Sequence, residues 1–235
     1  FQLHKCVLAD RTRVLYELVR TEESSSSDEN NCIVVLEDVG EKTFELLIRF
    51  VYSGVEPKVD DLVEATIKSI LVAANRFGVT ELKLYVESFL IEKFLVSSKA
   101  AAFLLFADSY SCGLLKEKSM DMYASNSKEV MESHEDWTKL KESNDLLVEL
   151  LVYATSDRKR YTSVVDDDGN DTIEDINGFD VTSLRERLQK VNLDVDGSRE
   201  ILVQRWKEYL LANDNKEIEE EEIETEEEEE EEIGI

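Results

Sequence analysis

Histidine, cysteine and long apolar runs are scarce in this sequence of 235 residues. The three cysteines are far apart, and with only two histidines a zinc site would need ligands from distant segments, so the spacing favours no such site. An odd number of cysteines without paired spacing indicates buried thiols in a reducing compartment rather than disulfides. No apolar run approaches the roughly 20 residues of a membrane span. We therefore expect no metal centre and no association with a membrane.

Catalytic motifs are also absent. The sequence contains no G-x-S-x-G motif, no glycine-rich phosphate loop and no cysteine beside a plausible histidine partner. The acidic run 166–171 suggests a calcium loop, but with Gly169 as its sixth position the first ligand is Val164 and the twelfth is Asp175. A calcium loop requires Asp and a bidentate Glu at those two positions. We therefore predict that the chain is not an enzyme and uses no cofactor.

Acidic residues are abundant, and the net charge is −27. Thirteen glutamates lie between Glu217 and Glu232, and without them 41 acidic residues face 27 basic ones, which leaves a charge of −14. Non-specific attraction of the whole chain to nucleic acid is therefore not expected. The glutamate-rich tail, residues 213–235, is predicted to be disordered because it cannot bury enough apolar surface.

Residues 44–95 contain three helical patterns in succession. Apolar residues recur at i, i+3, i+4 and i+7 from Phe44 to Val51, and Gly54 follows as a stop. A second pattern runs from Ile67 to Gly78, and a third begins at Thr80, which is a plausible N-cap. Short connections between such helices predict that they pack as neighbours.

These segments resemble a known family. FELLIRFVYSG, a proline turn and ILVAANRFGVTELKLYVESFL resemble the second half of a BTB (POZ) domain, and FQLHKCVLA resembles the F-x-x-HK-x-VLA segment of its first half. Residues 96–155 then resemble the BACK-type helical extension of speckle-type POZ proteins. The resemblance implies a mainly α fold with a small β-sheet, the α+β BTB/POZ fold, over residues 1–95. It also implies a substrate adaptor of a cullin-3 RING ubiquitin ligase that associates with itself.

Family resemblance also places two contact regions. Val7 and Leu8 fall in the candidate self-association helix, and Val19, Glu22 and Glu23 are the nearest candidates for the cullin-contact loop. Their spacing departs from the family's hydrophobic-x-Glu pattern. The serine-rich stretch 21–31 is predicted to be a solvated loop, and it could instead accept phosphate on Ser24 to Ser27. The β-branched run 32–36 that follows is predicted to be a strand.

Beyond an acidic linker at residues 156–177, residues 178–212 form a second predicted unit. Two helical stripes flank Asp196-Gly197-Ser198, and Gly197 to Arg205 resembles the diagnostic part of a SAP motif, a small helix-extended-helix module. A helix N-terminus with nearby cations can face phosphates. The candidate nucleic-acid contacts are Arg185, Lys190, Ser198, Arg199, Arg205 and Lys207.

The charge of this second unit is balanced. Between Phe179 and Tyr209, six basic residues are matched by six acidic ones, so protein binding remains an alternative to DNA or RNA binding. We therefore predict a protein-interaction scaffold that binds itself, cullin-3 and an unknown substrate, located in the nucleus and/or cytoplasm. The alternative is a nuclear regulator associated with chromatin or RNA, in which the BTB part dimerises and the SAP-like part binds nucleic acid.

Overall fold

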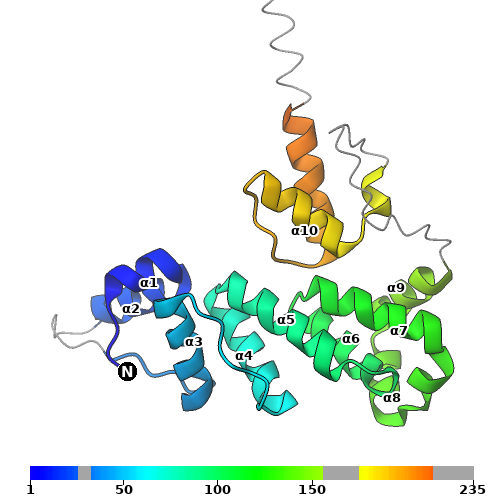
Figure 1. The fold of residues 1–235 in the computed structure, drawn as a ribbon, viewed down its shortest axis with the longest axis horizontal. Coiled ribbons are helices and arrows are strands. Elements are labelled where there is room, and N and C mark those ends of the chain that lie inside the picture. The colour runs from blue at the N-terminus through cyan, green and yellow to red at the C-terminus, as the bar shows by residue number, and fades with distance from the viewer. Residues whose placement is uncertain (26–32, 156–174, 214–235) are drawn as a thin grey trace, which may run out of the picture. The chain divides into compact units, whose positions relative to one another are not determined.

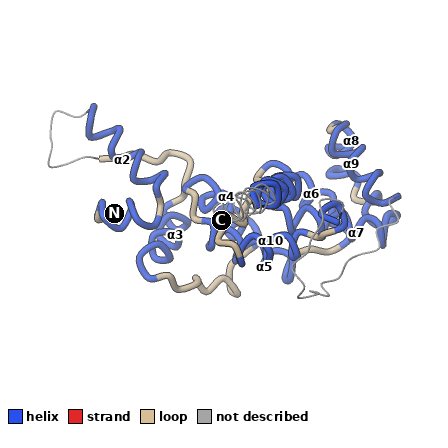
Figure 2. The backbone as a smooth tube through the Cα atoms, turned by 90° about the horizontal axis from the view of Figure 1, so that it is seen from above, coloured by secondary structure: helices blue, strands red, loops and turns tan. Residues whose placement is uncertain are grey.

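The computed structural model describes residues 1–25, 33–155 and 175–213. The chain divides into two compact units, residues 1–154 and 155–235. Both are helical, and the described residues contain no β-strand (Figures 1 and 2). No helix in the described ranges is long and apolar enough to cross a membrane.

Unit 1 begins with five α-helices in chain order. They are α1 (Lys5–Arg11), α2 (Arg13–Ser25), α3 (Glu41–Ser53), α4 (Glu64–Phe77) and α5 (Thr80–Phe94). The predicted stops at Gly54 and Gly78 are confirmed, since both have φ of 65° and end α3 and α4 in the left-handed region that favours glycine. The N-cap of α5 is Val79, so Thr80 is the first helical residue rather than the cap.

A single hydrophobic core runs through unit 1. The pairs α4–α5 and α3–α4 pack against each other, as their short connections predict, and α1 and α2 lie against α3 and α4. Ile67, Ile70, Leu71 and Phe77 of α4 are fully buried. Each such side chain contributes about 1.5–3 kcal/mol when it is removed from water. The α4–α5 hairpin is therefore the centre of the unit.

The predicted strand at residues 32–36 is not formed within the described part of this segment. Residues 33–36 have neither helical nor strand structure. A strand needs hydrogen bonds to a neighbouring strand, and no such neighbour lies in the described ranges. The small β-sheet expected for the BTB/POZ fold is therefore absent from the described residues, and the first unit is an assembly of helices.

The boundary between α2 and the serine-rich stretch also differs from the prediction. Helix α2 continues to Ser25, so residues 21–25 are helical rather than a loop, and residues 26–32 lie outside the described residues. Within the last turns, the Thr21 hydroxyl donates a hydrogen bond to the carbonyl of Glu17 at 2.8 Å. Good helix formers at Glu22 and Glu23 carry the helix past the point at which composition alone places a loop.

The helices after α5 belong to the same unit. They are η1 (Ser97–Lys99), α6 (Ala100–Ser109), α7 (Gly113–Glu132), α8 (His134–Glu142) and α9 (Asn144–Thr155). Helix α6 packs on α7 and α8, and α7 also packs on α5. In Figure 1 the helices of this unit follow one another in chain order, from α1–α3 to α8–α9. The region predicted to be a BACK-like extension is therefore continuous with the core of the first five helices.

Unit 2 is a small helical module. Its described elements are η2 (Asp175–Gly178), α10 (Val181–Lys190) and a helix at residues 199–213. Asp180 caps α10, because its Oδ1 accepts a hydrogen bond from the Ser183 amide at 2.7 Å. A second core is formed by Ile176, Phe179, Val181, Leu184, Leu188, Leu202, Val203 and Trp206. The predicted acidic linker up to residue 174, the calcium-like run within it and the tail from residue 214 lie outside the described residues.

Candidate functional site

Helix α2 carries the predicted cullin-contact residues Val19, Glu22 and Glu23. Positions i, i+3 and i+4 share one face of a helix, so the fold places these three positions together although their sequence spacing departs from the family pattern. Val19 is partly buried against the core, and Glu22 is exposed. The predicted loop is thus a helical face on which partly buried Val19 lies one turn before the exposed Glu22.

Helix α1 places the two predicted self-association residues against the chain's own core. Leu8 is 1% exposed, and Val7 packs on the same core with part of its side chain exposed. The outward face of α1 carries Cys6, Ala9 and Asp10 instead. Leu8 therefore anchors α1 to α2 and α3, and self-association through this helix stays a prediction.

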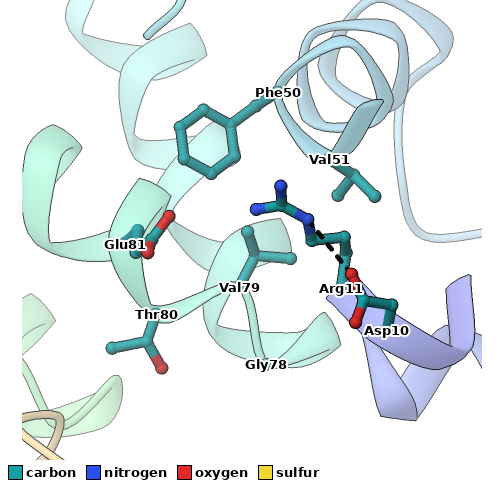
Figure 3. A pocket seen from close by; sticks show the side chains of 8 residues that line it. All are labelled: Asp10, Arg11, Phe50, Val51, Gly78, Val79, Thr80 and Glu81. Carbon is teal, nitrogen blue, oxygen red and sulfur yellow. Dashed lines mark ion pairs between the residues drawn. The ribbon is translucent and has the colours of Figure 1, made fainter. Parts of the chain in front are cut away.

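A pocket of about 280 Å³ lies beside the C-terminal end of α1. It is lined by Asp10, Arg11, Phe50, Val51, Gly78, Val79, Thr80 and Glu81 (Figure 3). Arg11 reaches toward Phe50, and its Nε lies 3.4 Å from the Asp10 carboxylate. The pocket is smaller than the roughly 300–1,000 Å³ of small-molecule sites, and its lining holds no nucleophile beside a base.

Glu64, the first residue of α4, links α4 to η1. Its carboxylate lies 2.7 Å from Lys68 Nζ and 2.6 Å from Lys99 Nζ. Lys68 Nζ also lies 4.2 Å from the centre of the Phe103 ring. Burial opposes the charged form of Glu64, but the hydrogen bonds from Lys68 and Lys99 outweigh it and lower the pKa of this carboxyl.

Two buried charged side chains join α5 to the start of α7. Glu87 is 0% exposed, and its Oε1 accepts a hydrogen bond from the Leu115 amide at 2.9 Å. This amide belongs to the first turn of α7, where backbone N–H groups have no partner within the helix. Lys83 is 1% exposed and donates to the Ser111 carbonyl at 3.3 Å. Ser111 has φ of 52°, so α5 holds a turn that non-glycine residues rarely adopt.

Lys116 connects three helices at the other side of α7. Its Nζ lies 2.8 Å from Asp108 of α6 and 2.8 Å from Glu149 of α9. Burial alone would lower the pKa of Lys116, but the hydrogen bonds to Asp108 and Glu149 outweigh it and raise that pKa. The Tyr153 hydroxyl also donates to Asp121 Oδ1 at 2.7 Å, which adds a second link from α9 to α7.

In unit 2, three of the predicted nucleic-acid contacts are used within the module. Arg185 Nε donates to the Val195 carbonyl at 3.2 Å, and Arg199 donates to the Phe179 carbonyl at 3.1 and 3.3 Å. Arg205 donates to the carbonyls of Asp194 at 2.6 Å and Asp196 at 3.0 Å. Its guanidinium also lies 3.2 Å from the Asp194 carboxylate. Arg185 and Arg205 therefore hold the extended connection between the two helices, while Arg199 holds the segment that precedes α10.

The other three predicted contacts are less constrained. Lys190 is exposed, and Lys207 and Ser198 are partly exposed. No ion pair of Lys190 or Lys207 occurs within the described residues. Ser198 accepts through its backbone carbonyl from the Leu202 amide at 3.1 Å, at the start of the second helix. The two lysines are therefore the cations that this module presents outward.

Sequence reasoning missed Lys83, Glu87 and Lys116 as residues that organise the fold. A signal was available for the first two, because they interrupt the apolar face formed by Leu82, Val86 and Leu90. Charged residues among core positions are almost never fully buried unless they are paired. Lys116 gave no comparable signal, since its partners lie eight and 33 positions away.

Metal-binding side chains are not clustered in the part of the chain that the structure describes. No group of three or more histidine, cysteine, aspartate or glutamate side chains within them could hold a metal ion. His4 makes two polar contacts with the Tyr52 hydroxyl. Its backbone amide donates to this oxygen at 2.7 Å, and its Nδ1 lies 3.1 Å from the same oxygen.

Comparison with known proteins locates the family. Residues 1–94 match the family model described as BTB/POZ domain. The chain is 29% identical over 147 residues to BTB/POZ and MATH domain-containing protein 6 of Arabidopsis thaliana, covering 57% of this chain and 34% of that protein. It is 30% identical over 148 residues to TD and POZ domain-containing protein 3 of Mus musculus, covering 63% of this chain and 39% of that protein.

A third relative gives the same result. TD and POZ domain-containing protein 5 of Mus musculus is 28% identical over 151 residues, which cover 63% of this chain and 42% of that protein. The chain thus spans less than half of the length of each of these relatives. The match to each mouse relative covers more residues of this chain than the 94 that match the family model. The similarity therefore continues past residue 94. Residues 1–94 are a BTB/POZ domain, which is a protein–protein interaction domain.

Proposed function

We propose that this chain is a self-associating scaffold that serves as a substrate adaptor of a cullin-3 RING ubiquitin ligase. The observation that carries the proposal is the continuation of the BTB/POZ domain into α6–α9 within one unit and one core. The similarity to the relatives extends in the same direction, past residue 94. A rigid helical body of this kind can hold a partner's docking surface and a substrate at fixed positions.

The face of α2 is the proposed cullin contact. Val19 supplies an apolar position beside the exposed carboxylate of Glu22, and Glu23 follows on the same side of the helix. A protein surface with an apolar pocket rimmed by cations would complement it. The neighbouring pocket beside α1, lined by Phe50 and Val51, is suited to receive a side chain of a bound protein.

Calorimetry of the whole chain with the N-terminal region of cullin-3 tests this proposal. We expect a Kd of about 1 μM or tighter, and weaker binding for the Glu22→Ala plus Glu23→Ala variant. Glu129→Ala plus Glu132→Ala is the matched control, because it removes the same charge from exposed positions of α7. Binding that is undetectable in the wild type, or equal loss in both double variants, contradicts the assignment to α2.

Self-association is tested separately by multi-angle light scattering of the same preparation. A mass of two or more chains that persists as the protein is diluted supports the scaffold. A monomer that nevertheless binds cullin-3 would retain the adaptor role and remove self-association from it. A monomer that fails to bind cullin-3 would remove both parts of the mechanism.

A second candidate function rests on unit 2. Its separate core and its two helices joined by an extended connection are consistent with the SAP-like resemblance. In this alternative the chain is a nuclear regulator that contacts DNA or RNA phosphates through Lys190 and Lys207. Arg199 and Arg205 are unsuitable for mutational tests, because both support the module internally.

Salt-dependent binding to a short DNA or RNA duplex tests this alternative. We expect binding at low salt that weakens as salt rises and is lost in Lys190→Glu plus Lys207→Glu. The control is Lys58→Glu plus Lys118→Glu, an equal charge change within unit 1. No binding of the wild type at low salt would leave the module with a protein-binding or structural role.

A further inference from the structure

Single residues join the last three helices of unit 1. Ser133 connects α7 to α8 with φ of −72° and ψ of 73°, and Ser143 connects α8 to α9 with φ of −93° and ψ of 88°. Both conformations lie near the inverse γ-turn, a common turn in which one residue redirects the chain. A change of ψ to about −42° at either residue would continue one helix into the next. Each serine therefore has the geometry of a hinge.

The joint at Ser133 is held on both sides. Helix α8 packs on α6 and α7, and Leu140 of α8 is fully buried. The Trp137 ring of α8 stacks on Tyr123 of α7, with 5.6 Å between the ring centres. The Ser133 hydroxyl also donates a hydrogen bond to the Val130 carbonyl at 2.6 Å. Movement at this joint would break all of these contacts, so α8 stays with α7.

Helix α9, beyond the second joint, is apolar on two faces. The residues of its inward stripe, at i, i+3, i+4 and i+7, are Leu146, Glu149, Leu150 and Tyr153. The two leucines belong to the core of unit 1. The outward face carries three apolar side chains that are between 46% and 59% exposed, namely Val148, Leu151 and Val152. Burial of the two leucines is therefore the whole apolar contribution that this stripe makes to docking.

Two polar contacts complete the attachment of α9. The Glu149 carboxylate lies 2.8 Å from Lys116 Nζ, and the Tyr153 hydroxyl donates to Asp121 Oδ1 at 2.7 Å. Glu149 and Tyr153 are one turn apart on α9, and both of their partners lie on α7. Lys116 also has a second partner, the Asp108 carboxylate of α6, at 2.8 Å. Departure of α9 would therefore not leave this cation unpaired, which limits the cost of opening.

We propose that Ser143 is a hinge at which α9 moves between a docked and an open position, while α1–α8 keep their packing. In the docked position, Glu149 and Tyr153 hold α9 on α7. In the open position Ser143 is helical, and α8 and α9 form one continuous helix over residues 134–155. Backbone hydrogen bonds across the joint offset part of the contacts that are lost. Exposure of Leu146 and Leu150 makes the open position the minor one.

This hinge goes beyond the adaptor function and does not depend on it. Because α9 is the last helix of unit 1, opening would also move the point at which the chain leaves this unit. Neither cullin binding nor self-association requires such a movement. A failure of the adaptor proposal would leave the hinge unaffected, since the tests below use no partner.

The distance between labels on α8 and α9 measures the two positions. The test uses the whole chain with Cys6 and Cys32 replaced by serine and the buried Cys112 retained. Spin labels are placed at Glu135→Cys and Ala154→Cys, both at exposed positions. A continuous helix separates these two Cα atoms by about 29 Å, at about 1.5 Å of rise per residue, and a bend at the joint makes the distance shorter. Electron paramagnetic resonance gives the fraction of each distance.

Variants of the polar contacts and of the hinge should shift this fraction in opposite directions. Glu149→Gln plus Tyr153→Phe should raise the fraction of the long distance about tenfold. Glu129→Gln plus Tyr110→Phe makes the same chemical changes away from the polar contacts of α9 and should leave it unchanged. Asn144→Pro should abolish the long distance, because proline suits the first position of α9 but breaks a continuous helix.

NMR distinguishes a continuous helix from unfolding of α9. In the Glu149→Gln plus Tyr153→Phe variant, we expect chemical exchange saturation transfer to detect a minor state with helical Cα shifts at Ser143 and throughout α9. Three results would overturn the proposal: only the short distance in this variant, a long distance that survives Asn144→Pro, or random-coil shifts of α9 in the minor state. If the variant does not fold, Ser143→Ala decides the question with both polar contacts in place, and it should raise the long-distance fraction about threefold.

Discussion

Polar groups are paired across helices in one part of unit 1 and left exposed in another. Between α5 and α9, the buried side chains of Lys83, Glu87 and Lys116 bond to groups on other elements. At residues 33–36, the described backbone forms no hydrogen bond, and apolar side chains point to solvent. The first arrangement fixes relative helix positions, while the second adds little stability.

Unit 2 follows the first pattern with a different residue type. Arg185 and Arg205 donate to carbonyls of the extended connection, and Arg199 donates to the Phe179 carbonyl. Most of the cations that the SAP-like resemblance assigns to phosphate therefore also stabilise the module. In both units, therefore, a charged residue is a poor indicator of a binding surface unless its internal hydrogen bonds are known. The comparison yields four predictions, ordered by the size of the expected effect on stability.

Glu87→Ala should have the largest effect. The change leaves the Leu115 amide without its acceptor and removes a fully buried carboxylate. We expect the free energy of unfolding to fall by about 3 kcal/mol in urea titrations followed by circular dichroism. Glu92→Ala, at an exposed position of the same helix, should change it by less than about 0.5 kcal/mol. Equal effects of the two variants would show that Glu87 does not hold α7.

Arg205→Ala should have the next largest effect, confined to unit 2. The variant loses hydrogen bonds to the carbonyls of Asp194 and Asp196 together with the Asp194 ion pair. We expect the local free energy of opening, measured by amide hydrogen exchange in α10 and residues 199–213, to fall by about 2 kcal/mol. Lys207→Ala is the control and should leave exchange nearly unchanged. Unaltered exchange in Arg205→Ala would mean that this arginine is available for an external partner.

Glu64→Gln should have a smaller effect that depends on pH. Because its pKa is lowered from the ordinary value of 4.5, the charged carboxyl stabilises the folded state above that pH. This contribution is lost as pH falls through the lowered pKa. The side chain is 24% exposed, so we expect Glu64→Gln to cost about 1 kcal/mol at pH 7 and to flatten the decline of stability below pH 4.5. Parallel stability curves for the wild type and the variant would contradict this.

Local sequence patterns predicted the helices well. The stripe from Phe44 to Val51 and the glycines at 54 and 78 are features of neighbouring residues, and α3 and α4 end where these glycines predict. The length of α2 was not predicted, because a serine-rich composition indicates a loop and does not show how far a preceding helix extends. The helical face that joins Val19 to Glu22 was therefore missed.

Distant partners could not be predicted. The run 32–36 has the composition of a strand, but a strand requires a second one, and nothing in the local sequence supplies it. Likewise, the positions of Arg199 and Arg205 suggested phosphate contacts. Their acceptors are instead backbone carbonyls nine or more residues earlier in the chain. Glu87 bonds a residue 28 positions later. Such pairings depend on the fold as a whole rather than on spacing.

Val35→Thr should have the smallest effect on stability. Threonine keeps the β-branched shape, and Val35 is 74% exposed, so urea titration should show a change within about 0.5 kcal/mol. Val86→Thr in α5 is the matched control: it places a hydroxyl at a position that is 0% exposed and should cost about 1–3 kcal/mol. If Val35→Thr costs as much as Val86→Thr, the segment is packed by its own chain. If it costs little, the exposed side chain of Val35 adds little to the stability of the fold.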